Sequence, residues 1–196
     1  MGIGFVDADP SLEPAMSSTH DELVLPDPAA PGDGFDVLDV CHRQTIFTLG
    51  KLAALVSALQ SRGPDPEARA LAAEVVHFFS ATAHDHHEDE ERHVFPRLLA
   101  SGKPEHVQAV QRLQQDHGWL EEDWLELSPH LDAVAAGQSW YDLDLLREGV
   151  DVFIALSHEH IALEESLIYP EARTQLRVSE RAAMGREMSA RRRARK

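Results

Sequence analysis

The chain repeats itself at a spacing of 74 residues, and this repeat limits what it can fold into. The segment HDHHEDEERHVFP (84–96) aligns with HEHIALEESLIYP (158–170). A shift of 75 residues aligns two further segments, around His42 and His117. Similarity at a fixed spacing means that one structural unit occurs twice. Each half of the chain should therefore contribute the same two elements.

The apolar residues of these four segments recur with helical spacing, and nothing reads as a run of alternating strands. In the first and third helices one histidine replaces a hydrophobic residue in a seven-residue pattern: Phe35, Leu38, His42, Thr45, Leu49, Leu52 and Val56, and then Val110, Leu113, His117, Leu120, Trp124, Leu127 and Leu131. The other two helices carry a histidine and a glutamate in this way: Phe79, Ala83, His86, Glu90 and Val94, and then Phe153, Ser157, His160, Glu164 and Leu167. Breaks at 63–66, 101–104 and 135–142 delimit the helices. We predict an all-α protein in which residues 35–176 form an antiparallel up-down four-helix bundle.

The two ends of the chain differ from this central part. Residues 1–34 hold five of the eleven prolines and show no sustained period, which predicts a flexible N-terminal arm. Residues 177–196 are predicted to form a short basic helix or tail, helical from about Ser179. Six basic residues and one acidic residue occupy 186–196, and we interpret them as a solvated helix end rather than an anion or nucleic-acid contact.

Composition excludes several classes of protein. A net charge of −16 argues against broad nucleic-acid binding, which depends on Lys and Arg contacts to phosphate. The single cysteine, Cys41, excludes an internal disulfide and a cysteine-rich metal site. The sequence has neither an apolar run approaching 18 residues nor the pattern of a signal peptide at its start. We therefore expect a cytoplasmic protein with no membrane partner.

The polar residues in the helix seams predict a metal centre. Of three His–Glu pairs four residues apart in 84–91, only His86 with Glu90 has a counterpart in the repeat. Buried carboxylates and imidazoles are costly without a cation. The predicted ligands are His42, His86, Glu90, His117, His160 and Glu164.

Two shared glutamates and two histidines would give each of two ions four protein contacts, and a bridging oxo or hydroxo group would make five. Such a mixed set with an open position suits two iron ions, with manganese or zinc as substitutes. The natural ligands of a redox-active metal site with an open coordination position are oxygen, peroxide and nitric oxide.

These motifs resemble the hemerythrin-like, HHE cation-binding domain. The resemblance rests on His42, HHEDEERHVFP, His117 in QQDHGWL and HIALEESLIYP, and covers about residues 36–172. It implies a four-helix bundle around a non-haem di-iron centre with the same six ligands. Oxygen-carrying hemerythrins have a further histidine where this chain has Glu121. That change would open a position or place a carboxylate on one iron, and we interpret Glu121 itself as a solvated residue.

Other notable residues have simpler interpretations. His84 and His158 should point away from the ligand seam. His87 and His93, which have no repeat partner, should face solvent, with an outer role behind the metal ligands as the alternative. Cys41 is interpreted as a small packed residue. Tyr169 is interpreted as core packing, with a ligand or radical role as the alternative. The tryptophans are expected to be core and helix-end anchors, at positions 119, 124 and 140.

The leading function is a di-iron protein that binds or senses oxygen, peroxide or nitric oxide. One alternative is an oxidoreductase that consumes peroxide or nitric oxide. It would need a protein redox partner as electron donor, because the chain has no flavin, nucleotide or Cys-rich motif. A second alternative is iron handling, resembling the family members that repair iron–sulfur clusters, although the Cys-containing segment typical of those proteins is missing here. A structural or regulatory role for the basic C-terminal helix is the remaining option.

Overall fold

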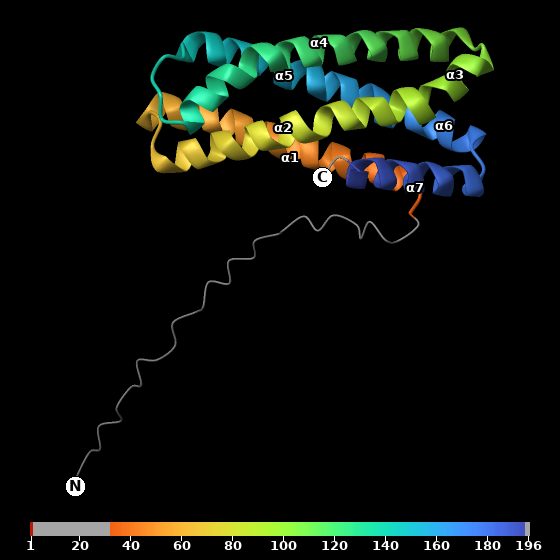
Figure 1. Ribbon diagram of the computed structural model, residues 1–196, viewed down its shortest axis with the longest axis horizontal. Coiled ribbons are helices and arrows are strands. Elements are labelled where there is room, and N and C mark those ends of the chain that lie inside the picture. Colours follow the sequence, from red (N-terminus) through yellow and green to blue (C-terminus); the bar gives the residue numbers. More distant parts are fainter. Residues whose placement is uncertain (2–31, 195–196) are drawn as a thin grey trace.

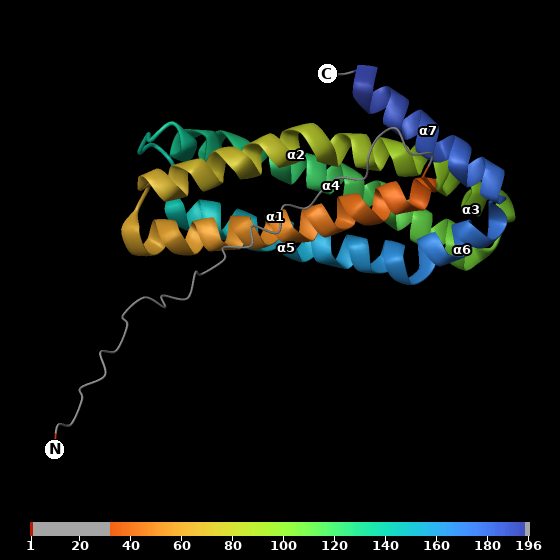
Figure 2. The same ribbon diagram turned by 90° about the horizontal axis from the view of Figure 1, so that it is seen from below.

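The computed structural model of the chain describes residue 1 and residues 32–194, and the described residues contain helices and no strand. Four of the helices are long, and Figures 1 and 2 show these long helices lying side by side, an arrangement compatible with a four-helix bundle. The all-α prediction is confirmed. Most of the predicted N-terminal arm, residues 2–31, lies outside the described residues. The elements in chain order are α1 (Gly34–Arg62), α2 (Pro66–His93), α3 (Phe95–Ser101), α4 (Pro104–Ala135), α5 (Leu143–Leu163), the π-helical turn η1 (Glu164–Ile168), α6 (Tyr169–Gln175) and α7 (Val178–Ala194).

The predicted breaks coincide with helix ends because they contain capping residues. Asp65 accepts a hydrogen bond from the amide of Ala68 at the start of α2, and Asp142 accepts from the amides of the first turn of α5. Gly63 and Gly102 follow α1 and α3 with φ of 71° and 66°, a conformation that favours glycine. The chain therefore reverses direction at these points.

Two apolar clusters fill the interior, and a layer of buried polar residues separates them. One cluster includes Leu52, Phe79 and Phe153. The other includes Phe35 and Leu113. The helices α1 and α4 contribute to both clusters, whereas α2 and α5 contribute to the first and continue into short helices that contribute to the second. The histidines and glutamates of the seams therefore lie between the two clusters, near mid-length of the molecule.

The second and fourth predicted helices are interrupted after the site, which the sequence analysis did not predict. The end of α2 at His93 is followed by α3, with Pro96 in its first turn. The π-helical turn η1 follows α5, and α6 then begins with Pro170 in its first turn. Proline cannot donate a backbone hydrogen bond, and π-helical turns are frequent at functional sites. Glu164 is the first residue of the π-helical turn.

The helix α7 begins at Val178 and packs against α1 and α2 (Figure 2). Its Met184 and Met188 are buried in the second apolar cluster. Its basic end is not the solvated end that the sequence suggested, because Arg191 and Arg192 both pair with the fully buried Asp89 of α2. The arginine side chains supply the charge that a carboxylate needs when it is removed from water.

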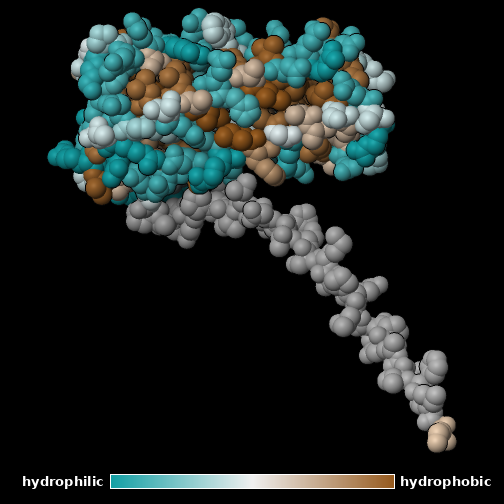
Figure 3. Space-filling model, turned by 180° about the vertical axis from the view of Figure 1, so that it is seen from behind, coloured by the Kyte–Doolittle hydropathy of each residue, from teal (hydrophilic) through white to brown (hydrophobic). Residues whose placement is uncertain are grey.

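Hydrophilic and hydrophobic patches alternate on the face drawn in Figure 3. Within the described part of the chain, none of the helices combines the length and apolar character that crossing a membrane requires.

Candidate metal centre

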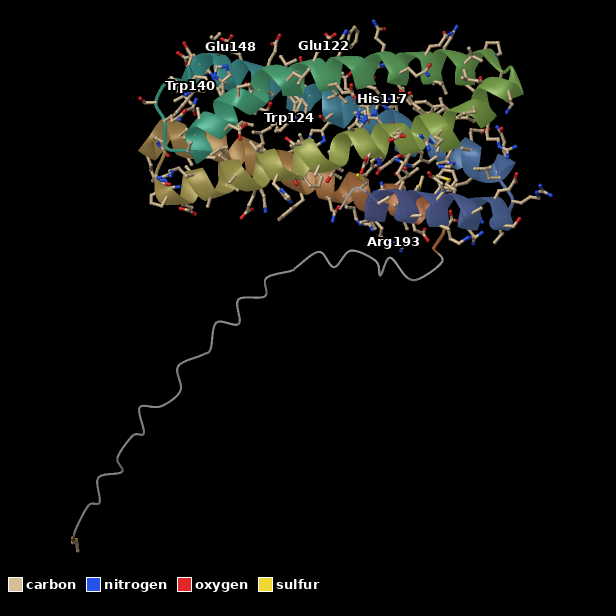
Figure 4. The ribbon with its side chains drawn as sticks, in the orientation of Figure 1. His117, Glu122, Trp124, Trp140, Glu148 and Arg193 are labelled. Atoms are coloured by element: carbon tan, nitrogen blue, oxygen red, sulfur yellow. The ribbon has the colours of Figure 1, made fainter. Side chains whose placement is uncertain are left out.

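All six predicted ligands meet in the polar layer between the two apolar clusters. No more than 5% of any of these residues is exposed. They come from α1, α2, α4, α5 and η1, and Figure 4 shows His117 on the side of α4 that faces the other helices. Their potential ligand atoms form two groups, and the atoms within each group all lie within 4.8 Å of one another. The first group contains His42 and His86 and the second contains His117 and His160, and both include Glu90 and Glu164.

The two glutamates each face both groups. Glu164 places Oε2 at 3.1 Å from His42 Nε2 and Oε1 at 2.9 Å from His160 Nε2. Glu90 places Oε1 at 3.6 Å from His86 Nε2 and Oε2 at 3.4 Å from His117 Nε2. Each carboxylate thus offers one oxygen to each group. This is the arrangement of a carboxylate that bridges two ions.

Several of these buried atoms lack a hydrogen-bond partner among the described residues. They are both oxygens of Glu164, Oε2 of Glu90, Nε2 of His117 and Nε2 of His160. Buried polar atoms are nearly always satisfied, so a cluster of unsatisfied ones needs an explanation. Two ligand atoms about 2.1 Å from one ion and at right angles lie about 3 Å apart, close to the observed spacing. The donor set therefore fits metal ions.

Two outer glutamates orient the single histidines. Glu165 Oε1 lies 3.1 Å from His42 Nδ1, and Glu91 Oε1 lies 2.9 Å from His117 Nδ1. A carboxylate on the far nitrogen fixes the ring and strengthens it as a ligand. Each of these glutamates comes from the opposite half to its histidine. The second glutamate of the repeated His-x3-Glu-Glu motif is the sequence signal for this role, which the repeat alone does not reveal.

The charges of the layer shift its pKa values in opposite directions in the metal-free chain. Burial lowers the pKa of His42, but the carboxylate of Glu164 beside it outweighs burial and raises the pKa to about 9. The pKa of His117 is raised to about 9 in the same way, with Glu90 outweighing burial. Burial lowers the pKa of His86 to about 3, which keeps that imidazole neutral. Burial alone would raise the pKa of Glu164, but His160 and His42 lower it below the ordinary value, so it stays ionised.

Comparison with known proteins agrees with this chemistry. The family model described as hemerythrin HHE cation binding domain matches residues 33–172. The chain belongs to this family. An uncharacterized protein of Haemophilus influenzae is 29% identical over 181 residues, which cover 92% of this chain and 96% of that protein. Membership of the HHE family supports metal binding, and the clustered histidines and glutamates are able to hold metal.

Equivalent aromatic rings stack on the single histidines of this HHE domain. The ring of Tyr169 stacks on His42 at 5.1 Å, and that of Phe95 stacks on His117 at 5.6 Å. Tyr169 is buried as expected, but its hydroxyl also donates to Glu90 Oε1 at 2.5 Å and lies 3.1 Å from His42 Nε2. Burial and the nearby carboxylates raise the pKa of this phenol, which keeps its proton. Packing alone is therefore an incomplete account of Tyr169.

The expectation that His87 and His93 face solvent is wrong. Only 8% of His87 is exposed, and its ring stacks on His117 with centroids 4.0 Å apart. His93 Nε2 lies 2.6 Å from Glu187 of α7. Both were misjudged because the repeat gave them no counterpart, whereas their burial depends on packing between helices.

The remaining interpretations have mixed outcomes. His84 and His158 are exposed as predicted, and Glu121 is half-exposed and bonds to His84 at 3.2 Å. Cys41 is buried, and burial raises the pKa of its thiol to about 12. Of the tryptophans only Trp124 packs in the core, whereas those at 119 and 140 are 47% and 58% exposed.

A cavity of about 240 Å³ adjoins the histidines of this domain. Four buried histidines line it, together with apolar residues that include Phe79, Leu120, Trp124 and Phe153; the histidines are His42, His86, His87 and His160. The cavity reaches the surface beside the exposed His84, Glu121 and Leu125. The site thus has a largely apolar route to solvent.

Proposed function

We propose that this HHE-family protein holds two iron ions and uses them to bind or sense oxygen, peroxide or nitric oxide. The ligands are His42, His86, Glu90, His117, His160 and Glu164, in an antiparallel up-down four-helix bundle of residues 35–176. Manganese and zinc are possible substitutes. The observation that carries the proposal is the sharing of Glu90 and Glu164, each with one oxygen toward each histidine pair.

The side chains of the chain hold and orient the centre. Glu91 and Glu165 fix the rings of His117 and His42, and the apolar clusters on both sides exclude water. A mixed set of imidazoles and carboxylates with open positions suits iron, whereas an all-oxygen set suits calcium or magnesium. Iron bound there would supply a reversible change of oxidation state and positions open to a guest.

The cavity beside the histidines supports a small, uncharged guest. Its volume of about 240 Å³ exceeds the space that one water molecule occupies in the liquid, about 30 Å³, several-fold. A diatomic molecule or a peroxide fits within it. Apolar walls penalise charged molecules, because their charge would lose hydration without compensation. The cavity therefore favours the guests named above over ionic substrates.

Burial of the ligands favours retained iron over iron delivery. Each of the six residues is at most 5% exposed, so a chelator or recipient protein has little direct access to them. We accordingly rank a sensor or binding protein of the cytoplasm above an iron donor. An oxidoreductase role for the same site would add a protein redox partner as electron donor.

Reconstitution with ferrous iron tests the proposal. We expect two iron ions per chain by metal analysis after anaerobic loading and removal of excess iron. Exposure to oxygen should produce a visible absorption band that changes on reduction and on addition of peroxide or nitric oxide. His158→Ala, at an exposed histidine, should behave as the wild type. A chain that takes up no iron, or stays colourless when loaded and oxidised, would contradict the proposal.

A further inference from the structure

His87 is a buried histidine that none of the six predicted ligand roles uses. It follows His86 on α2, and the aligned residue in the second half is Ile161. Only 8% of it is exposed, and its Nδ1 atom is buried without a hydrogen-bond partner among the described residues. A buried imidazole with an unsatisfied nitrogen calls for a ligand or an ion.

Two histidines of the second group lie beside this imidazole. Its ring centroid lies 4.0 Å from that of His117 and 5.7 Å from that of His160, which are themselves 4.9 Å apart. The two rings of the first group, His42 and His86, are 4.8 Å apart. Potential ligand atoms of His87, His117 and His160 lie within 4.8 Å of one another. The spacing of these three imidazoles is therefore similar to that of His42 and His86, the histidine pair of the first group.

We propose that His87 supplies a third imidazole to the ion of the second group. This inference rests on the proposed function. Oxygen-carrying hemerythrins, which the chain resembles, have a further histidine where this chain has Glu121. Here Glu121 is half-exposed on the neighbouring α4, 3.9 Å from His87 Nδ1. The nitrogen missing from α4 is thus supplied from α2.

A third imidazole makes the two ion positions unequal. The second group then offers three imidazoles and two carboxylate oxygens, and the first offers two of each. Histidines of both groups line the cavity, His42 and His86 from the first and His87 and His160 from the second. A guest in the cavity therefore lies beside both ion positions, and the one held by the first group would have fewer protein ligands.

Substitutions at His87 test this assignment in the full chain. His87→Ala removes the imidazole, whereas His87→Phe keeps a ring that can stack on His117 and removes only the nitrogen donors. Anaerobic titration with ferrous iron, with a competing chelator, should give two tight ions per chain for the wild type. Both variants should bind one ion tightly and the second at least about 100-fold more weakly, because loss of an outer partner alone costs 10–100-fold. His77→Ala, at an exposed histidine of the same helix, is the matched control and should bind as the wild type.

Added imidazole separates ligation from packing. It should restore the second ion in His87→Ala, where a space is left, and not in His87→Phe, where the ring fills that space. Circular dichroism of the metal-free variants should show unchanged helix content. Wild-type affinity for both ions in His87→Phe would overturn the assignment while leaving the proposed function intact. A wild-type chain that takes up no iron would instead remove the proposed function.

Discussion

The two metal groups are built from equivalent residues, and they differ only where the repeat fails. His42 corresponds to His117, and His86 to His160. The shared glutamates and the outer glutamates Glu91 and Glu165 are equivalent pairs as well. The non-equivalent positions include His87 opposite Ile161, Tyr169 opposite Phe95, and Asp89 opposite Leu163. Duplication therefore accounts for the symmetry of the six proposed ligands, and later divergence accounts for the differences between the two proposed ion positions.

The largest expected effect comes from a residue that serves both groups. In Glu164→Ala neither group keeps its full set of oxygens, so we expect loss of both ions from iron-loaded protein. A ligand present at a thousandfold excess over its Kd stabilises the folded state by about 4 kcal/mol, and this stabilisation should disappear for each ion. Metal analysis and thermal unfolding with and without iron measure the effect.

Glu159→Ala, at a side chain of α5 that is 69% exposed, is the control for Glu164→Ala. It should change neither metal content nor iron-dependent stability. If Glu164→Ala lost only one ion, the sharing of this carboxylate between the groups would be wrong.

The second largest effect concerns α7, which has no counterpart in the other half. Arg191→Met combined with Arg192→Met leaves the fully buried Asp89 without the two arginines that pair with it. Breaking a buried ion pair from one side costs about 3–5 kcal/mol. Chemical denaturation of the metal-free protein should show this loss, whereas Arg186→Met at an exposed position should stay within about 0.5 kcal/mol of the wild type.

Adding Asp89→Leu to the double arginine variant makes this position the same in the two halves of the chain, because leucine is the residue at the equivalent position 163. Replacing a buried ion pair by hydrophobic residues is often neutral, so most of the lost stability should return. A double arginine variant as stable as the wild type would mean that α7 contributes through Met184 and Met188 alone.

The sequence could predict the core of the site because duplication marks it. The same residue types at the same spacing in two places distinguish His86 with Glu90 from the two competing His–Glu pairs. Asp89 and His87 could not be found in this way, since each has an apolar counterpart and its role depends on a helix that is remote in sequence. The breaks before Phe95 and Tyr169 were missed for another reason: apolar spacing continues across them, and only the prolines that follow show that the helix is interrupted.

A smaller effect should separate the two groups from each other. Glu165→Ala removes the carboxylate from His42, and Glu91→Ala removes it from His117. Outer partners of this kind are worth 10–100-fold in metal affinity. Because these two carboxylates are 51% and 47% exposed, we expect about tenfold, near the low end, for one ion in each variant. Iron titration against a chelator measures it, and an equal loss at both ions in either variant would contradict the pairing.

The smallest effect should come from making the two aromatic positions alike. Tyr169→Phe keeps the ring stacked on His42 and removes the hydroxyl that donates to Glu90. A single hydrogen bond contributes about 0.5–1.5 kcal/mol, so unfolding free energy should fall by about that much and iron affinity by no more than about tenfold. Tyr141→Phe, at the chain's other tyrosine, is the control and should change neither. If Tyr169→Phe instead abolished binding at the first group, the phenol would be a ligand of that ion, and the two positions would differ by an oxygen as well as by the nitrogen of His87.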